Sequence, residues 1–522
     1  MAGRRIVLSL PVDFSQLPPE AWLDKAQQCL LAGDASRARE VIARALVTHP
    51  ESNALRFALA GLQRQAGDRA AADAELQALL EREPSHVAAA LQLARSLRER
   101  GRLLAAGELL RRSFALAPDE VERRLDAIEL LDDGGRQQDA MVLCEQAFAV
   151  GLSDDRLHVH AAALAAQLGR FEVARSHYET VFERSPQAAD WHVPLGLSSL
   201  QRYDSACHPD FARLLRRLEQ GELAPYAQSS LLFALGKAFD DIGETSRAAG
   251  FLSEANAIMH RLVRWQRKAW RRGVEMRLSR GPLPDPRMAT PEWTPVFIVG
   301  MPRAGSTLLA ERLARHPQVR HRGELPCLPT LASRIGAAGN SAATITAMRG
   351  AAQSYTEQLL QDDGAAGWYI DKQPHNFLHV DLILALFPNA RVIHCRREAH
   401  DNALSLWLQS FHPGAQDFAY DLGDIATVMR GARRQMAHWQ ARYPHAVRTV
   451  DYEALVADPD ACLGPLARWL GLPDTAGNSG AGTAALSTAS LWQARQPVYR
   501  SSVERWRRYV PYLPGLEGLR AE

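Results

Sequence analysis

Cysteine is scarce and scattered in this chain. The 522 residues contain six cysteines, with no CxxC pair and no Cys/His cluster at zinc-binding spacing. This pattern excludes a small fold held by disulfides and a structural zinc site, and it favours reduced thiols in a cytoplasmic protein. The cysteines are Cys29, Cys144, Cys207, Cys327, Cys395 and Cys462.

Long apolar runs and a large net charge are lacking as well. No stretch approaches the ~20 apolar residues of a membrane span, and the run Ile6–Val12 contains Pro11 and is short for a signal sequence. Sixty-one Lys and Arg residues against 59 Asp and Glu residues leave a net charge of +2, which excludes a dedicated polybasic binder. With 47% apolar residues, the chain is predicted to be globular and cytoplasmic, without a membrane span or a nucleic-acid partner.

What the chain does have is an internal repeat of 34 residues in its first half. A glycine recurs at this spacing five times, an alanine follows each glycine by five residues, and a proline follows four of them by 17. A left-handed helix C-cap favours Gly, a small Ala lets two helices approach, and Pro ends the second helix. The sequence therefore predicts five helical pairs. Their markers are Gly33, Gly67, Gly101, Gly135 and Gly169; Ala38, Ala72, Ala106, Ala140 and Ala174; and Pro50, Pro84, Pro118 and Pro186.

This pattern resembles the tetratricopeptide repeat over about residues 20–188. Beyond it the register slips, and Gly243 and Ala248 repeat the marker pair only later in the chain. The resemblance implies an α-solenoid of about five or six helical pairs over residues 20–280, after an N-terminal segment 1–19. Its concave surface is of a kind that binds protein or peptide segments. The alternative, an array that only packs on the following domain, stays open.

Two segments close this region. Residues 261–280 carry eight basic side chains, with Trp265 and Trp270 between them. They form either an anion-binding strip or, as we favour, a helix with its Trp face packed inward and its Arg face in solvent. Five prolines follow in the Pro-rich segment 281–295, which is predicted to be a linker to a second domain at residues 296–522.

A strand, a glycine loop and a helix follow the linker. Val296–Val299 is a short apolar run typical of a buried parallel strand, and Ser306–Arg315 has helical periodicity. Such a unit directs backbone N–H groups and a positive helix end at an anion. The loop Gly300–Gly305 has the spacing of a nucleotide P-loop, but its usual Lys is absent and its cation is Arg303. We expect phosphate binding by protein cations without an obligatory metal. A degenerate P-loop kinase is the alternative.

PVFIVGMPRAGSTLL resembles the 5′-phosphosulfate loop of sulfotransferases, which use 3′-phosphoadenosine 5′-phosphosulfate (PAPS) as donor. RREAHDNALS resembles their second motif, in which an Arg and a Ser eight residues apart grip the donor's 3′-phosphate; here these are Arg397 and Ser405. DKQPHNFLHV, TVDYEALVADP and STASLWQARQPVYRSSVERWRRY are similar to bacterial tetratricopeptide-repeat sulfotransferases, whose catalytic domain is related to tyrosylprotein sulfotransferases. The family fold is an α/β domain with a mostly parallel sheet and the donor at the carboxyl ends of its strands.

The resemblance also implies roles for single residues. Glu324 stands 21 residues after the loop Arg, where tyrosylprotein sulfotransferases have the catalytic base, and a capping or ion-paired glutamate is the alternative. Lys372 matches a lysine that neutralises the transferring sulfuryl group; its alternative is an ordinary ion pair with Asp371. His375 and His394 are rival bases, although packed histidines are favoured there. The implied catalytic set is Glu324, Lys372, Arg303 and Ser490, and the implied donor-binding set is Arg303, Ala304, Gly305, Ser306, Thr307, Arg397, Ser405, Tyr452 and Arg505.

Three functions are compatible with these features. The leading hypothesis is a PAPS-dependent sulfotransferase whose helical array presents a protein or peptide acceptor, such as a tyrosine. The second keeps the enzyme but gives it a glycan, lipid or small-molecule acceptor. The third is a repeat scaffold with an inactive nucleotide-binding domain, which the intact phosphate-binding residues argue against. A homodimer stays open.

Overall fold

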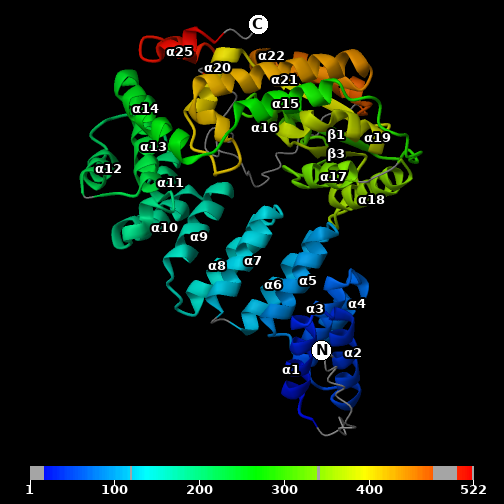
Figure 1. Cartoon of the computed structure of the whole chain (residues 1–522). Helices are drawn as coiled ribbons and strands as arrows, with labels where there is room; N and C mark the ends of the chain where they lie inside the picture. The colour runs from blue at the N-terminus through cyan, green and yellow to red at the C-terminus, as the bar shows by residue number, and fades with distance from the viewer. Residues whose placement is uncertain (1–16, 118–119, 221, 338–340, 474–501, 520–522) are drawn as a thin grey trace, which may run out of the picture. The chain divides into compact units, whose positions relative to one another are not determined.

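The computed structural model describes residues 17–117, 120–220, 222–337, 341–473 and 502–519 (Figure 1). The chain divides into two compact units. The first consists of Met1–Leu130 with Glu145–Leu152, and the second of Leu131–Cys144 with Ser153–Glu522. The second unit therefore joins the later helical pairs to an α/β part that contains the parallel sheet.

The 34-residue markers have the structural roles that the sequence predicts. Each marker glycine has a φ between 69° and 85°, the left-handed conformation that ends a first helix. Each marker alanine lies on a second helix and is at most 2% exposed, so a larger side chain would push the paired helix away. The ten helices are α1 (Pro19–Leu31), α2 (Ala35–Thr48), α3 (Asn53–Gln65), α4 (Arg69–Arg82), α5 (Val87–Glu99), α6 (Leu103–Leu116), α7 (Val121–Asp133), α8 (Gln137–Ala149), α9 (Asp155–Gln167) and α10 (Phe171–Arg184).

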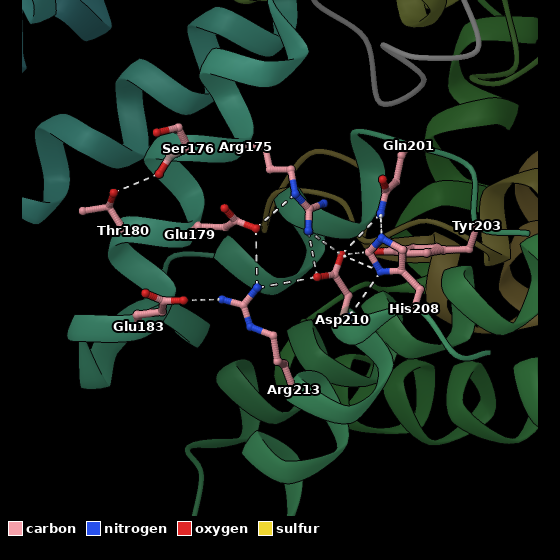
Figure 2. A network of polar contacts seen from close by, with 10 residues as sticks. All are labelled: Arg175, Ser176, Glu179, Thr180, Glu183, Gln201, Tyr203, His208, Asp210 and Arg213. Carbon is pink, nitrogen blue, oxygen red and sulfur yellow. Dashed lines mark hydrogen bonds and ion pairs between the residues drawn. The ribbon is translucent and has the colours of Figure 1, made fainter. Parts of the chain in front are cut away.

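A polar network holds the chain where it leaves the 34-residue register. Asp210 is 3% exposed and accepts hydrogen bonds from Arg175 Nη2 at 2.9 Å and from the Tyr203 hydroxyl at 2.8 Å. Figure 2 shows these side chains and Arg213 converging on the Asp210 carboxylate. Because its partners satisfy this buried charge, the network fixes the divergent segment onto α10. The elements of this segment are η2 (Pro186–Ala189), α11 (Val193–Ser199) and α12 (Pro209–Glu219).

A sixth helical pair follows the divergent segment. It consists of α13 (Pro225–Asp241) and α14 (Thr245–Leu262). Gly243 between them has a φ of 83°, and Ala248 is fully buried, as the repeated marker pair predicts. One hydrophobic core extends from these two helices into the α/β part of the second unit.

Two helices of the array contact the α/β part directly. Asn256 on α14 is buried and donates a hydrogen bond to the carbonyl of Trp407 at 3.0 Å. On α15 (Arg267–Leu278), the Trp270 side chain packs so closely on Gly431 that a Cβ there would fall 2.6 Å from the indole nitrogen. The basic segment 261–280 therefore packs its tryptophan face inward, in agreement with the favoured interpretation.

The α/β part is built on five parallel strands in the order β2-β3-β1-β4-β5. The run Val296–Val299 in the central strand is at most 1% exposed, which confirms the buried strand predicted from its apolar residues. Because all strands are parallel, their carboxyl ends lie along one edge of the sheet. The strands are β1 (Thr294–Gly300), β2 (Val319–His321), β3 (Trp368–Asp371), β4 (Arg391–Arg396) and β5 (Val447–Asp451).

Helices connect and cover these strands. Between α15 and β1, residues 279–293 form neither helix nor strand, which is the segment that the prolines occupy. In the part of the chain that the structure describes, no helix is both long and apolar enough to cross a membrane. The helices are α16 (Ser306–Leu313), α17 (Cys327–Gly336), α18 (Ser341–Leu360), η3 (Pro374–His379), α19 (Val380–Leu386), α20 (Ala399–Trp407), η4 (Asp417–Tyr420), α21 (Leu422–Arg442), α22 (Tyr452–Ala457), α23 (Pro459–Leu470), η5 (Arg505–Arg508) and α25 (Pro514–Glu517).

Candidate functional site

Every strand of the sheet leads at its carboxyl end to a residue of the predicted site. Strand β1 runs into the loop that contains Arg303, and Arg397 and Tyr452 directly follow β4 and β5. Lys372 directly follows β3, and Glu324 comes three residues after β2. The sheet edge therefore gathers residues that lie far apart in the sequence, as expected for a ligand site in an α/β fold.

The loop after β1 is shaped by two close backbone approaches. Gly300 has a φ of 143°, and a Cβ there would fall 2.3 Å from the carbonyl oxygen of Cys395. Gly305 has a φ of 92°, and its Cβ would fall 2.4 Å from the ring of Tyr452. Between them, Arg303 itself has a left-handed φ of 68°. Only glycine fits at both ends of this loop, and such a strained, over-determined backbone is typical of functional sites.

The loop delivers the N-terminus of α16 to the sheet edge. Ala304 is buried and donates its N–H to the carbonyl of Met301 at 3.2 Å, which closes the turn. The helix then begins at Ser306, and within the described residues no side chain caps this end. The amides of Ser306 and Thr307 belong to the first turn, whose N–H groups have no partner within a helix. This helix end can therefore bind an anion through its amides and its dipole.

Four of the predicted donor-binding residues lie together beside this helix end. Arg303 donates from Nε to the Ser405 hydroxyl at 3.2 Å, and Arg397 donates from Nη1 to the Arg303 carbonyl at 3.1 Å. The Arg397 guanidinium also lies 4.7 Å from the centre of the Tyr452 ring. We call Arg303, Arg397, Ser405 and Tyr452 the donor cluster.

The donor cluster fits a phosphorylated nucleotide. Within the described part of the chain, the Nε of Arg397 is buried and has no hydrogen-bond partner. A buried donor without a partner is costly, and an anion such as phosphate would satisfy it. Two guanidinium groups, a hydroxyl and a helix end provide donors for phosphate oxygens, and the Tyr452 ring adds an aromatic face.

The predicted base and the predicted lysine form an ion pair. Lys372 Nζ contacts Glu324 Oε1, although the two residues are 48 positions apart in the sequence. The Lys372 side chain is 3% exposed, whereas that of Glu324 is 43% exposed. The ammonium is therefore held inside the fold, and the carboxylate can meet a second molecule from solvent.

Asp371 is a structural carboxylate behind this pair and not the partner of Lys372. It is fully buried and accepts hydrogen bonds from the Tyr355 hydroxyl, from Asn376 Nδ2 at 2.7 Å and from the N–H of Leu325 at 3.2 Å. Burial raises the pKa of Asp371 to about 7. Because Leu325 directly follows Glu324, this carboxylate ties the loop of the predicted base to the end of β3.

The remaining predicted residues lie in different surroundings. Arg505 directs its guanidinium at Asp240 on α13, where the two form an ion pair. Burial lowers the pKa of His375 and lowers that of His394 to about 4, which agrees with packed histidines. Ser490 lies outside the described residues, so its role stays a prediction.

Two residues that support the site were not singled out from the sequence. Asn402 is 2% exposed and donates from Nδ2 to the carbonyl of Pro302 at 2.8 Å, which fixes the loop from the side of α20. Asp401, also buried, binds the C-terminal segment described below. Both lie on α20, about one helical turn before Ser405, and therefore on the same side of the helix as that residue. This spacing is a sequence signal that could have identified them.

We expect Gly305→Ala to weaken binding of adenosine 3′,5′-bisphosphate at least about tenfold. The substitution adds left-handed strain and forces the Tyr452 ring away, two effects of roughly 1–3 kcal/mol each. Gly471→Ala is the matched control, because Gly471 has a φ of 76° but open space around its Cβ direction. Isothermal titration calorimetry measures both. Equal affinities in the two variants would exclude the predicted clash at the site.

Models of two families match separate parts of the chain. Residues 295–476 match the model of the sulfotransferase family. Residues 19–62, and then 57–121 and 161–222, match two models of the tetratricopeptide repeat. The repeat matches lie within the helical array, whose last helices α13 to α15 follow them, and the sulfotransferase match starts within β1.

Individual relatives cover parts of the chain. An uncharacterized protein of Aquifex aeolicus (strain VF5) is 35% identical over 240 residues, which are 43% of this chain and 32% of that protein. Protein-tyrosine sulfotransferase 1 of Danio rerio is 23% identical over 239 residues, 41% of this chain and 66% of that protein. The chain thus spans about a third of the first relative and just under two thirds of the second. The solved sulfotransferase domain of the Synechococcus PCC 7002 olefin synthase is 19% identical, with a TM-score of 0.33, and covers 46% of this chain and 98% of that one.

Proposed function

We propose that the chain, which matches the models of the tetratricopeptide repeat and of the sulfotransferase family, transfers a sulfuryl group from PAPS to a tyrosine hydroxyl of a protein or peptide. One observation carries this proposal. All five parallel strands end at one edge of the sheet, and each leads to a residue suited to an anionic donor or to the transfer.

The donor cluster and the helix end account for donor binding. PAPS would supply the sulfuryl group and leave as adenosine 3′,5′-bisphosphate. Arg303 and the amides of Ser306 and Thr307 would bind the 5′-phosphate and stabilise the negative charge that develops on it. Arg397 and Ser405 would bind the 3′-phosphate. Tyr452, whose ring faces the loop, would contact the adenine.

Glu324 and Lys372 account for the acceptor side. The exposed carboxylate of Glu324 would take the proton from the acceptor hydroxyl as the new bond to sulfur forms. The buried ammonium of Lys372 orients that carboxylate, and it can stabilise charge on the transferring oxygens because it is shielded from water. Asp371 supports this arrangement by holding the N–H of Leu325.

Two observations support a peptide tyrosine as the acceptor. The matched relative from Danio rerio is named a protein-tyrosine sulfotransferase, and stacked helical repeats commonly bind extended peptide segments. A glycan, a lipid or a small molecule remains the alternative class of acceptor, and the experiment below separates these classes.

We expect calorimetry to detect binding of adenosine 3′,5′-bisphosphate without magnesium, because the site binds phosphate through protein cations. The second step incubates the protein with labelled PAPS and a lysate of the host cell, followed by separation of protein from small molecules. Label on tyrosine in the protein fraction supports the full proposal. Label only in the small-molecule or lipid fraction keeps the sulfotransferase and rejects the peptide acceptor. Binding that requires magnesium contradicts the assignment.

A further inference from the structure

A short C-terminal segment touches the donor cluster. The carbonyl of Ser502 accepts a hydrogen bond from Arg397 Nη2 at 2.9 Å, and the Ser502 hydroxyl lies 2.7 Å from the Tyr452 hydroxyl. The positions of the Arg397 and Tyr452 side chains therefore depend on the position of Ser502. We call residues 502–509 the strap.

The middle of the strap is fixed to α20. The buried carboxylate of Asp401 accepts the N–H of Glu504 at 2.6 Å and that of Trp506 at 3.0 Å. The Trp506 ring stacks on His400, with ring centres 4.4 Å apart. Since Glu504 has a left-handed φ of 58°, the strap makes a sharp turn that these contacts hold.

The far end of the strap is fixed to the helical array. Asp240, near the end of α13, pairs with Arg505 and accepts a hydrogen bond from the Tyr509 hydroxyl at 2.6 Å. The Asp240 side chain is 10% exposed and that of Arg505 is 23% exposed, so water screens this contact less than an ordinary surface pair. Tyr509 is fully buried.

We propose that the strap couples the last helical pair of the array to the donor cluster, with Asp240 as the positioning residue. This inference rests on the proposed function, because it assigns a nucleotide to the donor cluster. Asp240 fixes Arg505 and Tyr509, these fix the strap, and Ser502 then holds Arg397 and Tyr452 in the geometry that binds phosphate. An array ligand that moves α13 changes donor affinity through the same contacts, and donor binding changes affinity for that ligand equally.

The sequence resemblance assigns Arg505 a different role, as a direct ligand of donor phosphate. The two roles predict opposite changes in nucleotide affinity when the Asp240 carboxylate is removed. If Asp240 only restrains a phosphate ligand, its removal frees Arg505 and strengthens nucleotide binding. If Asp240 positions the strap, its removal loosens Ser502 and weakens nucleotide binding.

The test measures the dissociation constant of adenosine 3′,5′-bisphosphate by calorimetry for the full chain and for Asp240→Asn. We expect binding at least about fivefold weaker in the variant. Asp241→Asn is the matched control, because this neighbour on α13 pairs with Lys237 at 2.6 Å and accepts the N–H of Tyr203 at 3.1 Å, and neither partner belongs to the strap. We expect its affinity to stay within about twofold of the unchanged chain.

A double-mutant cycle separates positioning from general destabilisation. In an Arg397→Ala background, Asp240→Asn should cost much less affinity, because the strap acts through Arg397. Should Asp240→Asn fail to fold, Tyr509→Phe removes one donor to the same carboxylate and carries the same prediction. Unchanged or tighter binding in these variants, or full additivity in the cycle, overturns the coupling. Absence of nucleotide binding by the unchanged chain rejects the proposed function instead.

Discussion

Glu324→Gln is expected to lower turnover by about 10²-fold or more while leaving the affinity for adenosine 3′,5′-bisphosphate nearly unchanged. The amide keeps the shape of the side chain but cannot accept the proton of the acceptor hydroxyl. The donor cluster lies at the ends of β1, β4 and β5, whereas Glu324 follows β2 at the far edge of the sheet order. The substitution should therefore separate transfer from donor binding.

Glu324→Gln also removes the ion-pair partner of Lys372, and this side effect needs a control. This buried ammonium would face a neutral amide in the variant, which can destabilise the fold. Thermal unfolding and nucleotide titration show whether the variant is folded. Glu311→Gln, on α16 and 3.7 Å from His321, is the matched control and should keep turnover within a few-fold. Full activity of Glu324→Gln would mean that another group is the base.

The repeat array and the sheet could be predicted because their signals are local. Gly33 and its equivalents need a left-handed backbone, and the alanine five residues later needs close helix packing; both constraints act within one helical pair. Val296–Val299 is apolar throughout because a central parallel strand is covered on both faces. The divergent segment after α10 was not predictable in the same way, since a network around one buried carboxylate, Asp210, holds it together.

The candidate site was predictable as a set of residues but not as a set of contacts. Motif spacing identified Arg303, Arg397 and Ser405, and the parallel sheet brings these three together. The sequence suggested Asp371, the neighbour of Lys372, as its partner. Asp371 is instead the last residue of β3 and is held by other groups, and the structure pairs Lys372, which follows the strand, with Glu324. The contacts between distant side chains depend on the lengths and paths of the loops between strands. The motifs do not predict these paths.

Arg505 illustrates the same limit over a longer distance. Its basic character and its position within the last motif match a basic residue that reaches donor phosphate in the resembling family. Its contact with Asp240 joins residues 265 positions apart, from the helical array and from the C-terminal segment. Such a contact depends on the packing of α13 within the second unit, so only the fold reveals it. Whether Arg505 also reaches the donor stays a prediction that the Asp240 variants test.

Arg397→Ala is expected to weaken binding of adenosine 3′,5′-bisphosphate by roughly 2–4 kcal/mol, which is about 30-fold to 1,000-fold in dissociation constant. The variant loses the buried Nε that fits a phosphate oxygen, and it also releases the carbonyls of Arg303 and Ser502. Arg397→Lys should recover part of the loss, because a lysine restores the charge but not the fork of donors. Calorimetry over a range of salt concentrations measures the dissociation constants of both variants.

The neighbouring arginine provides the control for this prediction. Arg396 is exposed and pairs with Asp451, donating from Nη2 at 2.9 Å, so Arg396→Ala removes an equal charge without touching the donor cluster. We expect its affinity to change by less than about threefold, as for a surface ion pair. Equal losses of affinity in Arg396→Ala and Arg397→Ala would mean that nucleotide binding depends only on the general positive charge at the end of β4. The assignment of a specific phosphate contact to Arg397 would then be wrong.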